Sequence, residues 1–270
     1  MLHEATDRDL LGRLSAKVGS LQISKWILDE AGSRCSGRQV ESLAFEMAAR
    51  YLGGEPLQYI FGHWSFRSLE LNCDRRGLIP RPETELLVDL AISAIAANPA
   101  IVNVLEIGTG TGAIALALAS EISGLKILAI DNSPEALKLA RENLAAQASL
   151  KSEVEIVYSD LFSSLEDYGP FDLIVSNPPY IANSAKLDPR VAGYEPHQAL
   201  FAGEDGLSVI RRIIEGSPSV LSGGSAQHVL IEIGETHGRK VVELALRNGY
   251  SQVCIRKDLA GRDRFACLVL

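Results

Sequence analysis

The apolar residues of the N-terminal part of the chain follow the spacing of helices. Across Val40–Leu52 they recur every three or four positions with polar residues between them, which is typical of one buried helix face. Leu10–Val18 shows the same spacing, and a further helix is expected to start near Ser20. Gly53 and Gly54 are expected to end the last of these helices. The pattern therefore predicts a small helical region at the start of the chain.

After Pro82 the pattern changes to short apolar runs that alternate with amphipathic stretches. Buried runs separated by helices favour an α/β fold with a mainly parallel, doubly wound sheet. The expected helices cover residues 83–97, 110–122, 133–148, 205–216 and 237–248. The expected strands give a seven-stranded sheet: Val102–Leu105, Leu125–Ile130, Val154–Val157, Phe171–Val175, His228–Ile233, Gln252–Ile255 and Phe265–Leu270.

The segment between these two regions reads as a β-hairpin linker. Leu57–Phe61 and Phe66–Leu71 are short β-like runs, separated by a turn at Gly62–Trp64. Pro80 and Pro82 follow, and neither a helix interior nor a central strand accommodates this pair. We therefore expect a helical domain that includes the start of the hairpin and a second, larger domain, with bounds 1–75 and 76–270.

Composition and charge narrow the class of function. Of the 270 residues, 47% are hydrophobic and 22% are charged, which predicts a folded globular protein. The net charge of −8 argues against general nucleic-acid binding, because that binding needs clustered Lys and Arg. No stretch resembles a signal peptide, a membrane span or a metal-binding Cys/His motif. We expect a cytoplasmic protein without a membrane or metal partner.

A glycine-rich loop follows the first strand of the predicted sheet. Its spacing is G-x-G-x-G, whereas the dinucleotide fingerprint is G-x-G-x-x-G. Glycines allow a tight turn and let a ligand approach the backbone without meeting a Cβ atom. The residues are Gly108, Thr109, Gly110, Thr111 and Gly112.

Acidic residues accompany this loop. Glu106 precedes it and would suit a cationic group such as an amine or a sulfonium, and Asp131 ends the second strand, where an acceptor suits ribose hydroxyls. This combination resembles the Rossmann-like class I methyltransferases and implies S-adenosyl-L-methionine as cofactor, with S-adenosyl-L-homocysteine as product. A nicotinamide or other nucleotide, or a turn without a ligand, are the alternatives. Asp160, after the third strand, is a candidate for the adenine side or else a turn residue.

The fourth strand ends in Ser176-Asn-Pro-Pro-Tyr180. Asn177 offers both an acceptor and a donor, and Pro178 and Pro179 fix the backbone so that the Pro178 carbonyl lacks a local partner. Tyr180 adds a flat face with a polar tip. The Asn177 oxygen and the Pro178 carbonyl could together hold a planar amino group, so that positioning and electrostatics supply the rate acceleration.

N-P-P-Y resembles the catalytic motif of two groups of amino-methyltransferases. One group modifies exocyclic amines of adenine or cytosine, and the other modifies the side-chain amide of glutamine in proteins. Segments elsewhere resemble the second group, in particular the PrmC/HemK family of release factor glutamine methyltransferases, and this resemblance covers the full length. These segments are Gly54–Tyr59, Leu78–Glu85, Tyr194–Pro196, Ala199–Leu200, Gly203–Leu207 and Asp258–Arg264.

The resemblance implies N5-methylation of the glutamine in the Gly-Gly-Gln motif of class I peptide chain release factors. It places cofactor contacts at Gly108–Gly112, Asp131, Asp160 and Leu161, and both substrate and cofactor contacts at Asn177–Tyr180. Leu161 departs from the large aromatic residue that is common in the family, and Phe162 is the candidate to replace it. The alternatives are a ribosomal-protein glutamine, an adenine of nucleic acid, and a non-catalytic adaptor that binds the cofactor.

The amide-binding motif cannot by itself select one glutamine among many. Selectivity must then come from a surface outside the pocket. We expect the nearly neutral N-terminal helical domain to dock on the release factor and to orient its glutamine loop. The alternative is that this domain only stabilises the rest of the chain.

Overall fold

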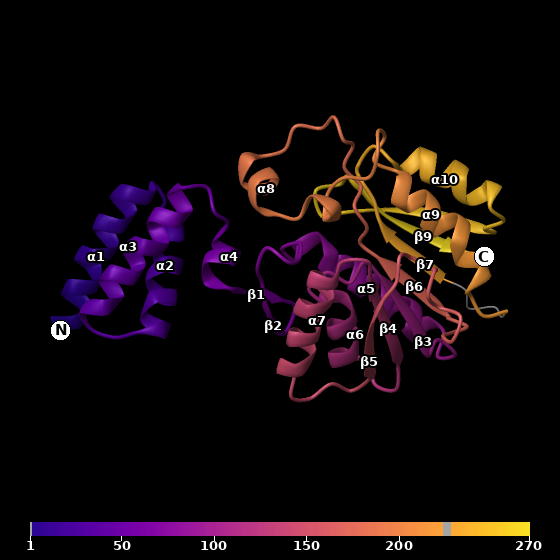
Figure 1. Ribbon diagram of the computed structural model, residues 1–270, viewed down its shortest axis with the longest axis horizontal. Coiled ribbons are helices and arrows are strands. Elements are labelled where there is room, and N and C mark those ends of the chain that lie inside the picture. Colours follow the sequence, from indigo (N-terminus) through magenta and orange to yellow (C-terminus); the bar gives the residue numbers. More distant parts are fainter. Residues whose placement is uncertain (1, 224–227) are drawn as a thin grey trace. The chain divides into compact units, whose positions relative to one another are not determined.

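The computed structural model describes residues 2–223 and 228–270, and its contacts divide the chain into two compact units (Figure 1). Unit 1 comprises Met1–Gly62 and Asp188–Tyr194. Unit 2 comprises His63–Leu187 and Glu195–Leu270. The chain therefore returns to unit 1 after it has built most of unit 2.

Unit 1 is helical. Ser20 caps the second helix by accepting a hydrogen bond from the Ile23 N–H at 3.4 Å, and Leu14, Ile27 and Met47 are buried between the helices. The unit consists of α1 (Leu2–Val18), α2 (Leu21–Arg34), α3 (Arg38–Leu52), α4 (Leu57–Phe61) and α8 (Pro189–Tyr194).

The expectation that Leu57–Phe61 is a β-run is wrong, because this segment is the short helix α4. The Pro56 carbonyl accepts hydrogen bonds from the N–H groups of Tyr59 and Ile60, which starts the helical turn. Four of the five residues of α4 are buried. A run of five residues in which only Gln58 is polar is too short to show a periodicity that separates a helix from a strand.

Unit 2 is an α/β unit, and the described residues form a seven-stranded sheet in the order β5-β4-β3-β6-β7-β9-β8 (Figure 1). All pairs are parallel except those of β9, which runs antiparallel to both of its neighbours. The strands are β3 (Asn103–Ile107), β4 (Lys126–Asp131), β5 (Glu153–Tyr158), β6 (Leu173–Ser176), β7 (His228–Glu232), β8 (Gln252–Lys257) and β9 (Asp263–Val269).

Helices cover both faces of this sheet. Successive strand residues such as Val104 and Leu105 belong to different apolar clusters, as the alternation of side chains along a strand requires. One cluster is completed by α5 (Pro82–Ala97), α6 (Ala113–Glu121) and α7 (Pro134–Ala146). The other is completed by α9 (Ser208–Gly216) and α10 (Gly238–Arg247). The expected helices and strands of this region are thus confirmed.

The hairpin of the expected linker is formed by β1 (His63–Phe66) and β2 (Leu69–Asn72), which pair antiparallel. It belongs to unit 2, so the contacts divide the chain after Gly62 rather than between residues 75 and 76. Phe66, Leu69 and Leu71 are buried in the same cluster as α5 and α6. Burial of its apolar face on unit 2 explains why the hairpin is part of that unit.

The strand order places a ligand-binding crevice between β3 and β6. From β3 the chain adds β4 and β5 on one side, and it then continues with β6 and β7 on the other side. The loops that leave β3 and β6 therefore run in opposite directions and leave a crevice at the carboxyl ends of the strands.

Among the described residues, no helix is both long enough and apolar enough to span a membrane.

Asn143 links the hairpin to the loop after β3, which generates a prediction for stability. Its amide oxygen accepts from the Asn72 N–H at 2.7 Å, and its nitrogen donates to the carbonyls of Asn72 and Thr111 at 3.1 and 2.9 Å. The side chain is fully buried. We expect Asn143→Ala to lower the free energy of unfolding by about 2 kcal/mol, because the buried Thr111 carbonyl and the two partly buried backbone groups of Asn72 lose their partner.

Urea unfolding measures this change. Asn183→Ala is the matched control, because Asn183 is exposed and, in the described part of the chain, its side chain forms no hydrogen bond. The control should change the free energy of unfolding by less than about 0.5 kcal/mol. Equal stability of the two variants would contradict the structural role of Asn143.

Candidate functional site

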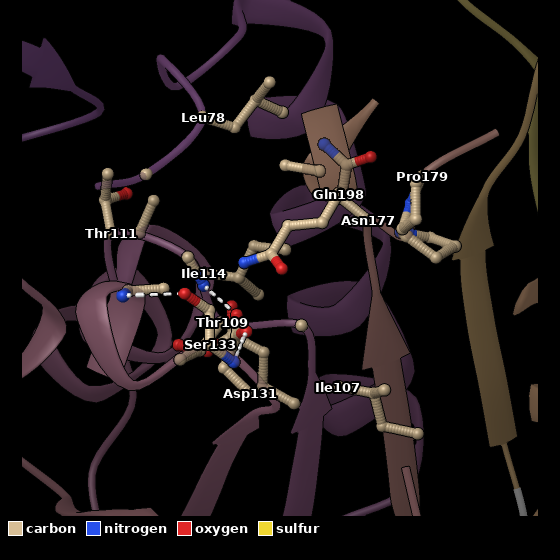
Figure 2. A pocket seen from close by; sticks show the side chains of 18 of the residues that line it. Leu78, Ile107, Thr109, Thr111, Ile114, Asp131, Ser133, Asn177, Pro179 and Gln198 are labelled. Atoms are coloured by element: carbon tan, nitrogen blue, oxygen red, sulfur yellow. Dashed lines mark hydrogen bonds between the residues drawn. The ribbon is translucent and has the colours of Figure 1, made fainter. Parts of the chain in front are cut away.

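A cavity opens at the crevice between β3 and β6, and all of its lining residues belong to unit 2. The loops after β3, β4 and β6 form its floor, and the segment before α5 and residues after α8 complete its wall. Figure 2 shows the side chains of Asp131, Asn177 and Gln198 around this cavity. The structure thus brings the glycine-rich loop and the N-P-P-Y motif together, as the topology of the sheet requires.

The glycine-rich loop turns sharply between β3 and α6. Gly110 and Gly112 have φ values of 55° and 83°, which residues with a Cβ rarely adopt. The N–H groups of Gly108 and Thr109 both donate to the Ile130 carbonyl at 2.9 Å, so the loop is tied to β4. The loop residues through Thr111 line the cavity, whereas Gly112 lies just beyond the lining, at the N-cap of α6.

Glu106 is buried below this loop, with 1% of its surface exposed. Its Oε2 accepts hydrogen bonds from the Thr109 hydroxyl at 2.7 Å and from the Ala115 N–H at 3.2 Å. Burial raises the pKa of Glu106 to about 8, although these hydrogen bonds act in the opposite direction. The carboxyl group contributes to the cavity lining, and it also holds the loop against the first turn of α6.

Asp131 is the last residue of β4 and lines the same cavity. Its two oxygens accept hydrogen bonds from the N–H groups of Gly110 and Ser133, each at 2.9 Å. Burial raises the pKa of Asp131, and the backbone N–H donors oppose that rise. The carboxylate is therefore fixed in position beside the glycine-rich loop, with acceptor capacity left for a ligand in the cavity.

Two of the three residues expected on the adenine side line the cavity. Asp160 and Leu161 line the cavity, and Asp160 forms an ion pair with Arg212 at 3.0 Å. Leu161 is buried and has a φ of 53°, an unusual value for a residue with a branched side chain. Phe162 does not line the cavity, because its ring packs against Gly216 at the end of α9. Of Leu161 and Phe162, the structure therefore places Leu161 at the cavity.

Asn177, Pro178 and Pro179 follow β6 and line the cavity opposite the glycine-rich loop. The Asn177 Nδ2 donates a hydrogen bond to the Thr84 hydroxyl at 2.9 Å. Within the part of the chain that the structure describes, neither the Asn177 Oδ1 nor the Pro178 carbonyl accepts a hydrogen bond. Two acceptors are thus available to a ligand at the carboxyl end of β6.

Tyr180 lies outside the cavity lining. Its hydroxyl donates to the Glu232 carboxylate at 3.1 Å, and the Arg264 guanidinium lies 5.9 Å from the centre of its ring. Burial raises the pKa of the Tyr180 hydroxyl. The side chain therefore contacts Glu232 and Arg264 behind the N-P-P-Y loop, outside the cavity lining.

Sequence reasoning assigned no site role to several lining residues. They come from the segment before α5 and from the residues that follow Tyr194, and they include Arg81 and Gln198. Arg81 pairs with Glu195 at 2.5 Å, and the other oxygen of Glu195 accepts from the Ile79 N–H at 3.2 Å. Arg81 and Glu195 lie in motifs that the sequence offers, whereas Gln198 falls between two of them, and only the fold shows that these segments meet at one cavity.

The motif at Gly203–Leu207 also has a structural role at this site. A Cβ atom at Gly206 would lie 2.4 Å from the Tyr180 carbonyl oxygen, so no larger residue fits there. The backbone of Ile181 pairs with Leu200 and Ala202 at 2.9 and 2.8 Å. These contacts hold the chain that follows Asn177–Tyr180 against the rest of unit 2.

The buried carboxyl group of Glu106 generates a prediction for pH dependence. A carboxyl with a pKa near 8 in the folded protein and an ordinary value in the unfolded chain favours folding at low pH. Its contribution is fully present below the unfolded pKa and is lost as the pH rises through about 8. The free energy of unfolding should fall by up to roughly 4 kcal/mol between these limits.

Glu106→Gln should remove this part of the slope, because glutamine does not titrate. Unfolding of both proteins by denaturant between pH 5 and 9 measures the difference. Identical slopes for the two proteins would show that Glu106 is already ionised in the folded state at low pH.

Comparison with known proteins agrees with this architecture. Residues 84–193 match the family model described as "Methyltransferase small domain". The methyltransferase from Pyrococcus furiosus matches with a TM-score of 0.53 and 20% identity over 83% of this chain and 96% of its own. The hMettl16 catalytic domain in complex with an RNA hairpin matches with a TM-score of 0.59 and 18% identity over 78% and 80%. These structures share the class I methyltransferase fold.

The sequence relatives are closer. The release factor glutamine methyltransferase of Deinococcus radiodurans is 41% identical over 85% of this chain and 80% of its own length. The enzymes of that name from Vibrio cholerae and Thermodesulfovibrio yellowstonii are 42% and 35% identical over 81% and 92% of this chain, and over 74% and 88% of their own lengths. With identity at this level over most of both chains, the protein belongs to the release factor glutamine methyltransferase family.

Proposed function

We propose that this protein transfers a methyl group from S-adenosyl-L-methionine to the side-chain N5 of the glutamine in the Gly-Gly-Gln motif of class I release factors. The observation that carries the proposal is a pair of free acceptors, the Asn177 Oδ1 and the Pro178 carbonyl. Their residues line the same cavity as the glycine-rich loop. Two acceptors on consecutive residues match in number the two N–H groups of a primary amide. Membership of the family supports the same substrate.

The cavity residues suit the cofactor. The tight loop at Gly108–Gly112 lets a ligand lie against the backbone, and the fixed Asp131 carboxylate offers acceptors to a pair of ribose hydroxyls. Leu161 offers an apolar surface at the cavity, and Glu106 provides a carboxyl group beneath the loop. S-adenosyl-L-methionine supplies an electrophilic methyl group on its sulfonium, and S-adenosyl-L-homocysteine is the product.

The main task of the cavity residues in methyl transfer is to orient the amide nitrogen. An amide nitrogen is a weak nucleophile because its lone pair is delocalised into the carbonyl group. The Asn177 Oδ1 and the Pro178 carbonyl each accept one of its N–H bonds, which increases electron density on the nitrogen and holds it in line with the methyl group. The nitrogen becomes acidic as it gains the methyl group, so it can lose its proton after transfer without a strong base in the cavity.

We therefore assign Asn177 and Pro178 to substrate binding and catalysis, and Pro179 to the rigid shape of the same wall. Tyr180 acts from outside the lining, through Glu232. We propose no nucleic-acid substrate, since the net charge of the chain is −8. Because release factors act on ribosomes, we place the protein in the cytoplasm.

Transfer of a labelled methyl group tests the proposed function. The wild-type protein should label a purified class I release factor and should not label a ribosomal protein or DNA. Asn177→Ala should reduce kcat by about a hundredfold or more, because an acceptor used in the transition state is lost. Its affinity for the cofactor should stay within about threefold of wild type, since the amide oxygen faces the substrate.

A release factor whose Gly-Gly-Gln glutamine is replaced by alanine is the control substrate and should take up no label. Label on this control substrate, or a normal kcat of the Asn177→Ala protein at saturating substrate, would contradict the assignment.

We propose further that unit 1 docks the release factor. Besides α1–α4, this unit contains α8, in a segment that begins at Asp188, after Tyr180 in the sequence. Within unit 1 the Arg190 guanidinium lies 4.4 Å from the centre of the Tyr51 ring and donates to its hydroxyl at 2.9 Å. The Tyr194 hydroxyl donates to the Gly53 carbonyl at 3.2 Å. The chain that leaves the catalytic motif is therefore anchored in the proposed docking unit.

Deletion of residues 1–55 tests this docking role. The cavity is lined by unit 2 alone, so the shortened chain should bind the cofactor within about threefold of the full chain. Its kcat/KM should fall by about a hundredfold for the intact release factor and little for a short Gly-Gly-Gln peptide, because the peptide has no docking surface to lose. Equal losses on both substrates would show that unit 1 only stabilises the rest of the chain.

A further inference from the structure

The amide group of Asn177 is the first member of a chain of hydrogen bonds that leads away from the cavity. Its Nδ2 donates to the Thr84 hydroxyl oxygen at 2.9 Å. The Thr84 hydroxyl in turn donates to the Glu232 carboxylate at 2.8 Å. Thr84 and Glu232 are 4% and 1% exposed, so this chain is shielded from water.

The fold brings these three residues together from separate elements. Ser176 of β6 pairs with Ile231 of β7, so the next residues, Asn177 and Glu232, leave neighbouring parallel strands side by side. Thr84 lies in the first turn of α5, which begins at Pro82. The start of this helix is thus placed over the ends of both strands.

The chemistry of the chain allows only one orientation of the amide. The Glu232 Oε2 accepts a hydrogen bond, and the Thr84 hydroxyl has a single hydrogen, which it gives to this oxygen. The Thr84 oxygen can then only accept, and only the nitrogen end of the Asn177 amide can donate to it. The Asn177 oxygen is left for the cavity.

The carboxylate at the end of the chain has further partners. Its second oxygen accepts from the Tyr180 hydroxyl at 3.1 Å, and Arg264 approaches that hydroxyl at 3.4 Å. Burial raises the pKa of Glu232, whereas the two hydroxyl donors and the charge of Arg264 act in the opposite direction. The orientation requires only that Oε2, the oxygen that accepts from Thr84, carries no proton, and the contact with the other oxygen gives Tyr180 a role outside the cavity lining.

We propose that Thr84 and Glu232 are positioning residues that fix the side-chain amide of Asn177 with its oxygen toward the substrate nitrogen. This inference rests on the proposed function, since the oxygen matters only if the acceptor of the methyl group carries N–H bonds. A reversed amide would present N–H groups to the N–H groups of the substrate and would favour its carbonyl oxygen instead. The two residues therefore also decide that the nitrogen of the glutamine amide, and not its oxygen, faces the methyl group.

Thr84→Val removes the hydroxyl and keeps the shape of the side chain. We expect kcat to fall roughly 10- to 100-fold at saturating release factor, because the amide is free to turn. KM for the release factor and the affinity for the cofactor should stay within about threefold, since the Thr84 hydroxyl is engaged by Asn177 and Glu232 and valine keeps the shape of the cavity wall. Thr84→Ser restores the hydroxyl and should recover kcat to within about threefold of wild type. A loss of packing alone would not give this pattern.

Glu232→Leu provides a second route to the same result, which also applies if the valine variant does not fold. Leucine has no acceptor oxygen, so the Thr84 hydroxyl loses its partner and becomes free to donate to the oxygen end of the Asn177 amide. The variant should lower kcat and leave the affinity for the cofactor within about threefold. Ser217→Ala is the matched control, because it removes a fully buried hydroxyl that donates to the Ile213 carbonyl, outside this chain of hydrogen bonds. Its kcat should equal that of wild type.

Normal kcat in either Thr84→Val or Glu232→Leu would overturn the inference, as would a Thr84→Ser variant that is as impaired as Thr84→Val. Absence of transfer by the wild-type protein itself would instead count against the proposed function. The wild-type reaction in the same experiment separates the two failures.

Discussion

The hydrogen bond from the Asn177 Nδ2 to the Thr84 hydroxyl is the interaction on which the proposed mechanism depends. An asparagine amide has a donor end and an acceptor end of almost the same shape, so its orientation must be set by its partners. Here the donor end is engaged inside the protein, and the acceptor end remains at the cavity. The positions of α5, β6 and β7 are those that this arrangement requires.

The glycine-rich loop, which forms the other half of the site, is also held in one orientation by hydrogen bonds, here from its backbone N–H groups. The loop after β3 is held by hydrogen bonds to Ile130, and its Gly110 N–H is held by Asp131. Both halves meet because the order of the strands reverses between β3 and β6, which opens a crevice where their loops diverge. Both halves are held by hydrogen bonds among the described residues.

Much of this arrangement could be predicted from the sequence because it rests on local or periodic patterns. The strands of unit 2 are apolar runs bounded by polar residues, and the loops at Gly108–Gly112 and Asn177–Tyr180 carry short motifs with a direct physical meaning. The segment Leu57–Phe61 could not be assigned correctly, because five residues, four of them buried, are too few to show the helical period.

Other features depend on contacts between distant residues and leave no local signal. Glu232 lies at the end of an ordinary apolar strand, and only the pairing of β6 with β7 shows that it lies beside Asn177. The return of residues 188–194 to unit 1 has no pattern in the sequence that distinguishes it from a loop. Phe162 is the aromatic residue of the pair, but its ring packs beside Gly216, outside the cavity. Leu161 lines the cavity instead.

Mass spectrometry of a class I release factor after reaction with this protein and S-adenosyl-L-methionine tests the central claim most directly. The fragment spectrum locates the methyl group along the chain and distinguishes a side-chain amide from a main-chain or amine position. The arrangement of Asn177 and Pro178 predicts one added methyl group, on the side-chain nitrogen of the glutamine in the Gly-Gly-Gln motif. A methyl group on a lysine, on a terminal amine or on the amide oxygen would contradict it.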